Sequence, residues 1–468
     1  MARNNRTSKE SPLEVPDRIS RRAWLAAAGA GSLALIAACR GTADIAVEGR
    51  PLTDELDLRW CWCGGVTDRW ATVVAAFRSP EGVELIVLDA AGASVGTTKQ
   101  LGSAPGGVLR FQVSGLEPLT VYHYGFVRRG APTPGGRFST LPVTGAATSF
   151  AIAMGSCSDQ FDNPVFRAIR NQKPLLFMHN GDLHYRSFHT NDPNDFREAY
   201  DAVLADAAQA DLYRSCGVTY MWDDHDFGPN NSGHDNPSYD AVHAVYRERV
   251  PHYPFRLQAE SRTRAAPILQ AFSVGRVRFI VTDLRSEHLR EPGSLMGARQ
   301  RAEFFAELVD AMREHRLVVW MSSVPWNGSD CKDAWACAAP ERVLVADFIK
   351  KHGVPVCIVS GDAHMVAIDD GRNTDYATGG GAPIPVFQAG SLGQSGSYKG
   401  GPYSHGACAG GRQFGLMKVD DDGQSLRVSW SARDGSDGFG DRVVAANVDA
   451  EGLIEYRFEV NADGALLR

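Results

Sequence analysis

The sequence predicts an α/β protein in which a small antiparallel β-sandwich precedes a larger α/β sandwich. Two patterns support this prediction. From about Leu56 to Phe138, short apolar runs alternate with turn residues, which is typical of antiparallel β-sandwiches. After Thr148, apolar strand segments alternate with segments of helical periodicity, which is typical of α/β folds. The length of 468 residues allows roughly two to three domains with sizeable cores.

The composition excludes several classes of protein. Hydrophobic residues make up 44% of the chain and charged residues 22%, values of a globular rather than a disordered protein. The net charge of −7 argues against a general surface for nucleic acids or anionic membranes, which would need a basic excess. No apolar run reaches the roughly 18–20 residues that a membrane-spanning helix needs. We expect a soluble mature protein without a nucleic-acid-binding surface.

Residues 1–39 are predicted to be an export signal. A paired arginine, Arg21-Arg22, is followed by an aromatic residue, a leucine and an alanine-rich stretch over residues 26–38. This pattern resembles a twin-arginine (Tat) signal, so the Tat translocase is the expected partner during export. Residues 36–39 resemble a lipobox in which Cys39 carries a lipid anchor, and an alanine-rich tail with an ordinary cysteine is the alternative. The expected location is the periplasm, the cell envelope or the outside of the cell.

Residues 51–142 are predicted to form the small β-sandwich. Within it, residues 116–124 resemble the strand-turn-strand corner of fibronectin type III domains. Residues 132–142 are rich in glycine, proline, serine and threonine and mark its end. Residues 92–96 fit the pattern G-x-S-x-G, but they fall between two predicted strands with no helix following. This context argues against a serine hydrolase.

Residues 148–468 are predicted to form the α/β sandwich. Its strands are expected at residues 150–154, 175–178, 218–222, 278–282, 317–321 and 356–359. Its helices are expected at residues 195–213, 239–249, 299–313 and 342–351. After Pro385 the pattern returns to strands, which are expected at residues 415–419, 426–430 and 455–460.

The nine cysteines give limited information. The sequence contains no C-x-x-C pair, which argues against a zinc ribbon or a thioredoxin-like motif. A bridge between Cys331 and Cys337 is conceivable outside the cytoplasm, because both lie in one short polar loop. Cys61 and Cys63 alternate along a predicted strand and point the same way, which disfavours a bond between them.

Polar clusters follow four of the predicted strands, each at the point where the strand ends. In an open α/β sheet, ligands bind beyond the carboxyl ends of the strands, so residues distant in sequence converge there. Small residues in or before most of the clusters allow the backbone to turn sharply. The clusters are Gly155-Ser156-Cys157-Ser158, Asn180-Gly181-Asp182-Leu183-His184-Tyr185, Trp222-Asp223-Asp224-His225-Asp226 and Ser360-Gly361-Asp362-Ala363-His364.

Single residues in these clusters have ordinary explanations, but together the clusters predict a metal site. Taken alone, Cys157 is a packing residue, Tyr185 a core residue and Asp182 the cap of a turn. The three acids within residues 223–226 repel one another unless a cation or solvent neutralises them. Residues 361–364 place two metal-binding groups two positions apart after a buried strand. We therefore expect the four clusters to share a metal centre.

The order of the motifs GSC, GDxxY, WDDHD and SGDxH, behind a fibronectin-like module and a Tat signal, resembles the alkaline phosphatase D (PhoD) family. This family belongs to the calcineurin-like metallophosphoesterase superfamily and is related to purple acid phosphatases. Residues 283–286 also resemble the Asp-x-Arg-Ser segment of the family. The resemblance extends from about Leu56 to Trp430 and does not cover the substrate-facing loops. It implies that residues 148–468 form a metallophosphoesterase catalytic domain.

The resemblance also implies a centre that contains iron and calcium. Asp182 would bridge two metals, because one carboxylate can serve two cations held close together. Cys157 and Tyr185 would bind Fe³⁺ as thiolate and phenolate, and Asp362 and His364 would complete the metal shell. The Ser-Cys-Ser segment replaces the Asp-x-His of generic dizinc enzymes, which argues against zinc alone. One or two Ca²⁺ ions are expected, and other divalent metals are possible.

Further roles follow from the same resemblance. Asp224 stands where related phosphoesterases place an asparagine that binds the second, divalent metal. His225 matches the histidine that lies beside the scissile phosphate and stabilises or protonates the leaving group. The pair Asn230-Asn231 offers oxygen ligands to calcium. Arg285 either holds a phosphate oxygen or forms a structural salt bridge, and His184 is expected at the surface or, alternatively, behind the metal ligands.

The expected function is the hydrolysis of organic phosphate mono- or diesters by metal-activated water. No serine or threonine nucleophile accompanies the clusters, so no phosphoenzyme is expected. A phosphodiesterase for phospholipids or teichoic-acid-like polymers is an alternative, which an aromatic groove near Trp326, Tyr398 and Tyr403 would favour. A non-catalytic binding lipoprotein of the cell envelope is another. Loss of a ligand would support the latter, and every ligand is present.

Overall fold

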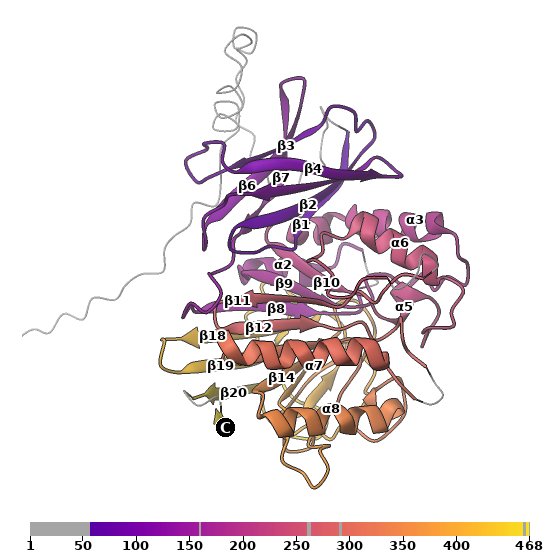
Figure 1. The fold of residues 1–468 in the computed structure, drawn as a ribbon, viewed down its shortest axis with the longest axis vertical. Helices are drawn as coiled ribbons and strands as arrows, with labels where there is room; N and C mark the ends of the chain where they lie inside the picture. Colours follow the sequence, from indigo (N-terminus) through magenta and orange to yellow (C-terminus); the bar gives the residue numbers. More distant parts are fainter. Residues whose placement is uncertain (1–56, 159–160, 260–263, 290–292, 462–464, 468) are drawn as a thin grey trace, which may run out of the picture.

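The computed structural model describes residues 57–158, 161–259, 264–289, 293–461 and 465–467 (Figure 1). The predicted export signal at residues 1–39, with Cys39, lies outside the described residues, as does the start of the predicted module at residues 51–142. Within the described ranges, no helix is both long and apolar enough to cross a lipid bilayer.

The N-terminal strands form the predicted antiparallel β-sandwich at one end of the molecule (Figure 1). One layer has the order β1-β2-β5-β4 and the other the order β3-β6-β7. The hydroxyl of Tyr122 accepts a hydrogen bond from the backbone N–H of Glu117 at 2.9 Å, the geometry of a tyrosine corner. The strands are β1 Leu58–Gly64, β2 Trp70–Phe77, β3 Glu84–Leu88, β4 Thr97–Ala104, β5 Val108–Ser114, β6 Val121–Arg128 and β7 Ala131–Ser139.

The first layer of this β-sandwich continues into the larger part of the protein. β1 pairs in parallel with β10, with Gly64 opposite Val218, so that one sheet of order β21-β20-β19-β18-β8-β9-β10-β1-β2-β5-β4 runs through both parts. The predicted boundary between residues 51–142 and residues 148–468 therefore falls within a region whose strands share one sheet. The further strands are β8 Phe150–Gly155, β9 Leu176–Asn180, β10 Gly217–Met221, β18 Gln413–Asp421, β19 Leu426–Asp434, β20 Glu455–Val460 and β21 Leu466–Leu467.

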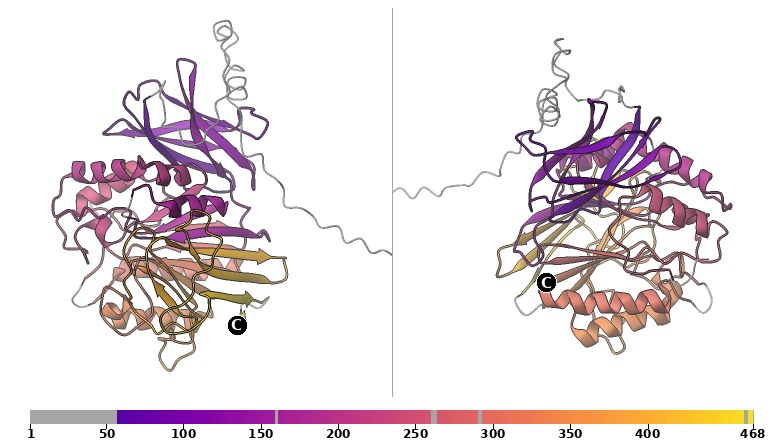
Figure 2. Two further views of the ribbon diagram at one scale, coloured as in Figure 1. Left: turned by 180° about the vertical axis from the view of Figure 1, so that it is seen from behind. Right: turned by 45° about the horizontal axis from the view of Figure 1, so that its top comes forward.

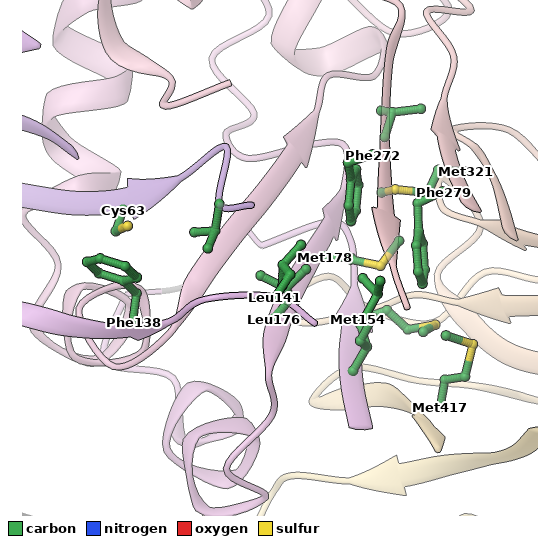
Figure 3. Close-up of a cluster of buried hydrophobic side chains, with 14 of the residues drawn as sticks. Cys63, Phe138, Leu141, Met154, Leu176, Met178, Phe272, Phe279, Met321 and Met417 are labelled. Carbon is green, nitrogen blue, oxygen red and sulfur yellow. The ribbon is translucent and has the colours of Figure 1, made fainter. Parts of the chain in front are cut away.

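A second sheet of order β11-β12-β13-β14-β16-β15-β17 packs face to face against the first. Met154 and Met178 of the first sheet lie against Phe279 and Met321 of the second in the shared core (Figure 3). These side chains are buried, and such apolar burial is the main favourable term in folding. The strands are β11 Gln270–Val274, β12 Val277–Val281, β13 Leu317–Ser322, β14 Val356–Ser360, β15 Met365–Asp369, β16 Val386–Ala389 and β17 Ala407–Ala409.

Helices cover the outer faces of both sheets, which completes the predicted α/β sandwich. Buried residues of α2, α3, α4 and α6 form one core with the first sheet, and those of α7 and α8 form another with the second. α7 and α8 lie side by side (Figures 1 and 2). The helices are α2 Pro164–Asn171, α3 Pro193–Leu204, α4 Ala207–Tyr213, α5 Asp224–Phe227, α6 Tyr239–Arg249, α7 Gly297–Glu314 and α8 Ala339–His352.

One predicted helix is wrong. The single helix expected at residues 195–213 is two helices, because Asp206 caps a new start: its side chain accepts the backbone N–H of Gln209 at 3.0 Å. The short strands β15 and β17 and the helix α2 were not expected from the periodicity. The conceivable bridge between Cys331 and Cys337 is present, whereas Cys61 and Cys63 are free and buried.

The junction between the two parts of the large sheet is closely packed at Gly64. We therefore predict that a larger side chain at this position lowers the stability of the fold. A Cβ at Gly64 would lie 2.5 Å from the carbonyl oxygen of Pro251 and closer still to that of Val218. Gly64→Ala should therefore lower the free energy of unfolding by about 1–3 kcal/mol, the usual cost of overpacking. Denaturant unfolding of the wild type and of Gly64→Ala measures the difference in the free energy of unfolding.

Gly102→Ala is the matched control, because Gly102 also lies in a strand and has open space around its Cα. Equal unfolding midpoints for Gly64→Ala and Gly102→Ala would show that the junction does not depend on this close approach.

Candidate metal centre

The four predicted clusters meet in one place, at the carboxyl ends of β8, β9, β10 and β14. Cys157 follows β8, and its Sγ lies 3.7 Å from Oδ2 of Asp182, which follows β9. The same sulfur lies 3.7 Å from the carbonyl oxygen of Asp362, which follows β14 in the other sheet. The site is therefore built where the strands of both sheets end, as the rule for open α/β sheets predicts.

The turns that present these side chains have unusual backbone conformations. Cys157, Asp182 and Asp362 have φ values of 62°, 56° and 63°, in the left-handed region that non-glycine residues avoid. Gly181, before Asp182, has φ 104°, and a Cβ there would lie 2.5 Å from Cβ of Asp223. Strained residues of this kind cluster at functional sites, where the surrounding structure holds them in place.

The first group of possible ligands contains Cys157, Asp182 and His364, whose ligand atoms lie within 4.8 Å of one another. The hydroxyl of Tyr185 lies beside it, 2.8 Å from Oδ2 of Asp182 and 3.2 Å from Nε2 of His364. The backbone carbonyl of Ser395 lies 2.9 Å from Nδ1 of His364, which turns Nε2 towards the group. Burial lowers the pKa of His364, which favours the neutral imidazole that binds metals.

The second group contains Asp182, Asp224 and His225, so the carboxylate of Asp182 belongs to both groups. Nδ1 of His225 lies 2.9 Å from Oγ of Ser187, and its ring packs against Tyr185 with 4.3 Å between the ring centres. These two contacts fix the orientation of the imidazole. Oδ2 of Asp224 accepts the backbone N–H of residue 231 at 2.6 Å.

The third group contains Asp223, Asp224 and Asp362, and two cationic side chains already contact it. Nε of Arg285 lies 2.5 Å from Oδ1 of Asp223. Nζ of Lys399 lies 2.7 Å and 2.5 Å from the two carboxylate oxygens of Asp362. This group is therefore partly neutralised by the protein itself.

The electrostatics of the cluster fit a bound cation. Burial, and then the neighbouring carboxylates, raise the pKa of Asp182 well above its usual range. Burial and the charge of Asp182 likewise raise the pKa of the Cys157 thiol and of the Tyr185 phenol. Oδ1 of Asp224 and Oδ2 of Asp223 have no hydrogen-bond partner among the described residues. Around Asp182, Cys157 and Tyr185, a metal ion would supply the positive charge that these side chains lack, so the residues present fit one.

Asp226, the last acid of the third motif, has a positioning role that the sequence did not reveal. Its carboxylate accepts the backbone N–H groups of Asp182, Leu183 and Asp223 at 2.6–2.9 Å, and that of His184 at 3.3 Å. Burial raises its pKa to about 7, whereas the N–H groups favour the charged form. Asp226 therefore ties the turn after β9 to the turn after β10.

Of the two alternatives for Arg285, the structure shows the salt bridge. Its side chain is fully buried, and its Nη atoms lie 3.0 Å and 2.8 Å from the two oxygens of Asp333. Together with Asp223, this carboxylate pairs the guanidinium, so the buried contacts favour the structural salt bridge over the contact with phosphate. Arg285 is instead a positioning residue behind Asp223 and Asp224.

The expected surface position of His184 is corrected. His184 is not at the surface: its ring is buried among Phe188, Phe196 and Tyr200. The backbone N–H of Asn231 donates to Asp224, which places this residue beside the second ligand group, and Asn230 is exposed. The motif thus does not predict where each of its side chains lies, because aromatic packing and turn geometry determine this.

Two charged residues of the site were missed entirely. Lys399 lies in the loop between β16 and β17, and Asp333 lies inside the loop closed by the bridge between Cys331 and Cys337. Neither belongs to a motif or follows a strand. No sequence signal identifies them, because each meets its partner only through the tertiary fold.

The comparisons with known proteins agree with this geometry. A family model described as PhoD-like phosphatase matches residues 150–413, more than half of the chain. The chain belongs to this family. The assignment agrees with the resemblance that the sequence motifs show. Alkaline phosphatase D of Bacillus subtilis (strain 168) is 23% identical over 306 residues, which cover 54% of this chain and 52% of that protein. The match thus spans about half the length of this relative.

Solved structures show the fold. The structure of a protein described as PhoD superposes with a TM-score of 0.66 at 17% identity, covering 90% of this chain and 93% of that one. A purple acid phosphatase from yellow lupin (Lupinus luteus) gives a TM-score of 0.56 at 13% identity, covering 86% and 75%. These similarities confirm the predicted fold, an α/β sandwich.

The buried salt bridge predicts a large loss of stability on removal of Arg285. Arg285→Met leaves Asp223 and Asp333 buried without their cation, and breaking a buried pair in this way costs about 3–5 kcal/mol. Arg427→Met is the control, because Arg427 forms an exposed pair with Asp422 that is worth at most about 1 kcal/mol. Thermal or denaturant unfolding measures both. A normal unfolding midpoint for Arg285→Met with only a raised KM would restore its role in phosphate binding.

Proposed function

We propose that this protein hydrolyses organic phosphate mono- or diesters with a metal-activated water molecule. The observation that carries the proposal is the position of Asp182, whose carboxylate belongs to two adjacent ligand groups. A shared carboxylate holds two cations close together, as in two-metal phosphoesterases. The family assignment supports the reaction class.

The ligand sets favour two different metals. Cys157, Tyr185, Asp182 and His364 offer sulfur, phenol, carboxylate and imidazole, and the anionic donors among them suit Fe³⁺. Asp182 and Asp224 offer carboxylate oxygens, which suit Ca²⁺ or another hard divalent cation. When bound, these cations supply Lewis-acid activation of water and neutralise charge that develops at phosphorus.

His225 is positioned to handle the leaving group. Ser187 and the ring of Tyr185 hold its imidazole at the edge of the second ligand group. As the oxygen of water bonds to phosphorus, the bond from phosphorus to the ester oxygen breaks, and His225 donates a proton to that departing oxygen. The proposed products are the free alcohol and phosphate, or a phosphate monoester when the substrate is a diester.

The structure removes one argument for a polymer or lipid substrate. Of the aromatic residues that would have lined an extended groove, Trp326 and Tyr403 are buried, and only Tyr398 is exposed, with its hydroxyl bonded to Asp449. We therefore favour small phosphate esters over polymers. A non-catalytic binding lipoprotein is disfavoured because each predicted metal-ligand residue is present in the sequence.

Export through the Tat translocase, with a lipid anchor at Cys39, is part of the proposal. The motif around Arg21-Arg22 supports it. The bridge between Cys331 and Cys337 supports it as well, because disulfides persist mainly in oxidising compartments. A chain that folds before export can acquire its metals in the cytoplasm.

The first test is metal analysis of protein purified without added metal, combined with its visible absorption spectrum and the hydrolysis of a chromogenic phosphate monoester and diester. Iron with a phenolate-to-iron absorption band, together with calcium, is the expected result. Zinc or manganese without colour would keep the hydrolase but contradict iron. Absence of metal and of hydrolysis, even after iron and calcium are supplied, would favour the binding lipoprotein.

Two substitutions should separate metal binding from turnover. Asp182→Asn removes the shared carboxylate charge and should abolish metal binding and hydrolysis together. His225→Asn should retain the metals but lower kcat about 10²- to 10⁴-fold, the usual contribution of a general acid. Metal content and single-substrate kinetics measure both effects. Loss of metal from His225→Asn would make His225 a ligand, and unchanged kcat would remove it from the mechanism.

A further inference from the structure

Lys399 is a cation that the chain itself places in the metal centre. Its ammonium bonds both carboxylate oxygens of Asp362, at 2.7 Å and 2.5 Å. Only 22% of the Lys399 side chain and 5% of the Asp362 side chain are exposed, so this pair is largely shielded from solvent. It therefore differs from a surface ion pair, in which water screens the charges.

The loop that carries Lys399 is anchored on both sides of this residue. The hydroxyl of Tyr403 donates to the carbonyl of Lys399 at 3.0 Å, and the backbone N–H of Tyr403 donates to Asp449 at 2.9 Å. The hydroxyl of the preceding residue, Tyr398, donates to the same carboxylate. Asp449 thus holds both flanks of the loop, which fixes the ammonium before any ligand binds.

The three ligand groups differ in the charges that surround them. The first two are formed by cysteine, tyrosine, histidine and aspartate side chains around Asp182. The third meets Arg285 at Asp223 and Lys399 at Asp362, so two of its three carboxylates are already paired with protein cations. An ammonium is a compact point charge with three donors and can occupy the place of a small cation among carboxylates.

We propose that the Lys399 ammonium takes the place of a divalent cation at the group formed by Asp223, Asp224 and Asp362, so that the protein binds two metal ions and not three. This inference rests on the proposed function and specifies its metal centre: one Fe³⁺ and one Ca²⁺. Asp362 then orients Lys399 and supports the turn after β14, and its carboxylate is not a metal ligand. The metal ligands of the proposal are those grouped around Asp182.

The test is the number of calcium ions that bind per chain in purified full-length protein. Lys399→Met removes the ammonium while it keeps an unbranched side chain of similar length, and it should add one equivalent of Ca²⁺. Lys399→Arg keeps a cation and should bind the same number as the wild type. Lys418→Met is the matched control, because Lys418 is exposed on β18, and it should also match the wild type. Equilibrium dialysis with metal analysis of the dialysed protein gives these numbers without reference to activity.

Each outcome decides the inference. A third equivalent of metal in the wild type, or unchanged calcium stoichiometry in folded Lys399→Met, would overturn it. If Lys399→Met does not fold, the wild-type and Lys399→Arg stoichiometries still decide between two ions and three. A wild type that binds no metal at all would remove the proposed metal centre itself, which is distinguishable from a centre with three ions.

Discussion

Five aspartate carboxylates are buried together where the strands of both sheets end, and their mutual repulsion constrains the whole site. They are Asp182, Asp223, Asp224, Asp226 and Asp362. Contacts within the protein reduce this repulsion. Backbone N–H groups donate to Asp226, Arg285 pairs with Asp223 and Lys399 pairs with Asp362. Burial and the neighbouring carboxylates still raise the pKa of Asp182, which belongs to two of the ligand groups, so a metal ion there would supply missing positive charge.

The fold supplies the rigidity that such a concentration of charge requires. The core between the two sheets contains large buried side chains such as Phe279 and Met321, and helices cover both outer faces. Each ligand follows directly from a buried strand, and the left-handed turns at Cys157, Asp182 and Asp362 leave little freedom to relax apart. The strain in these turns, about 1–3 kcal/mol per residue, is tolerated because the surrounding packing determines the backbone.

The sequence allowed much of this architecture to be predicted, because regular periodicity and strand-end motifs are local signals. The helix at residues 239–249 and the strand at residues 455–460 were predicted with the bounds that the structure has. The positions that failed depend on tertiary partners. Whether Arg285 meets a phosphate or carboxylates depends on Asp333, 48 residues away, and Lys399 acts on Asp362 across 37 residues. The periodicity of a sequence does not indicate such contacts, because the partners are far apart in the chain.

The bridge between Cys331 and Cys337 has a consequence beyond the loop that it closes. Asp333 lies inside this loop of sequence separation 6, and its carboxylate holds the guanidinium that neutralises Asp223. Reduction of the bridge would allow Asp333 more conformations and would therefore weaken its ion pair with Arg285. The thiol–disulfide balance of the surroundings is thereby linked, through two buried ion pairs, to the balance of charge beside the metal ligands.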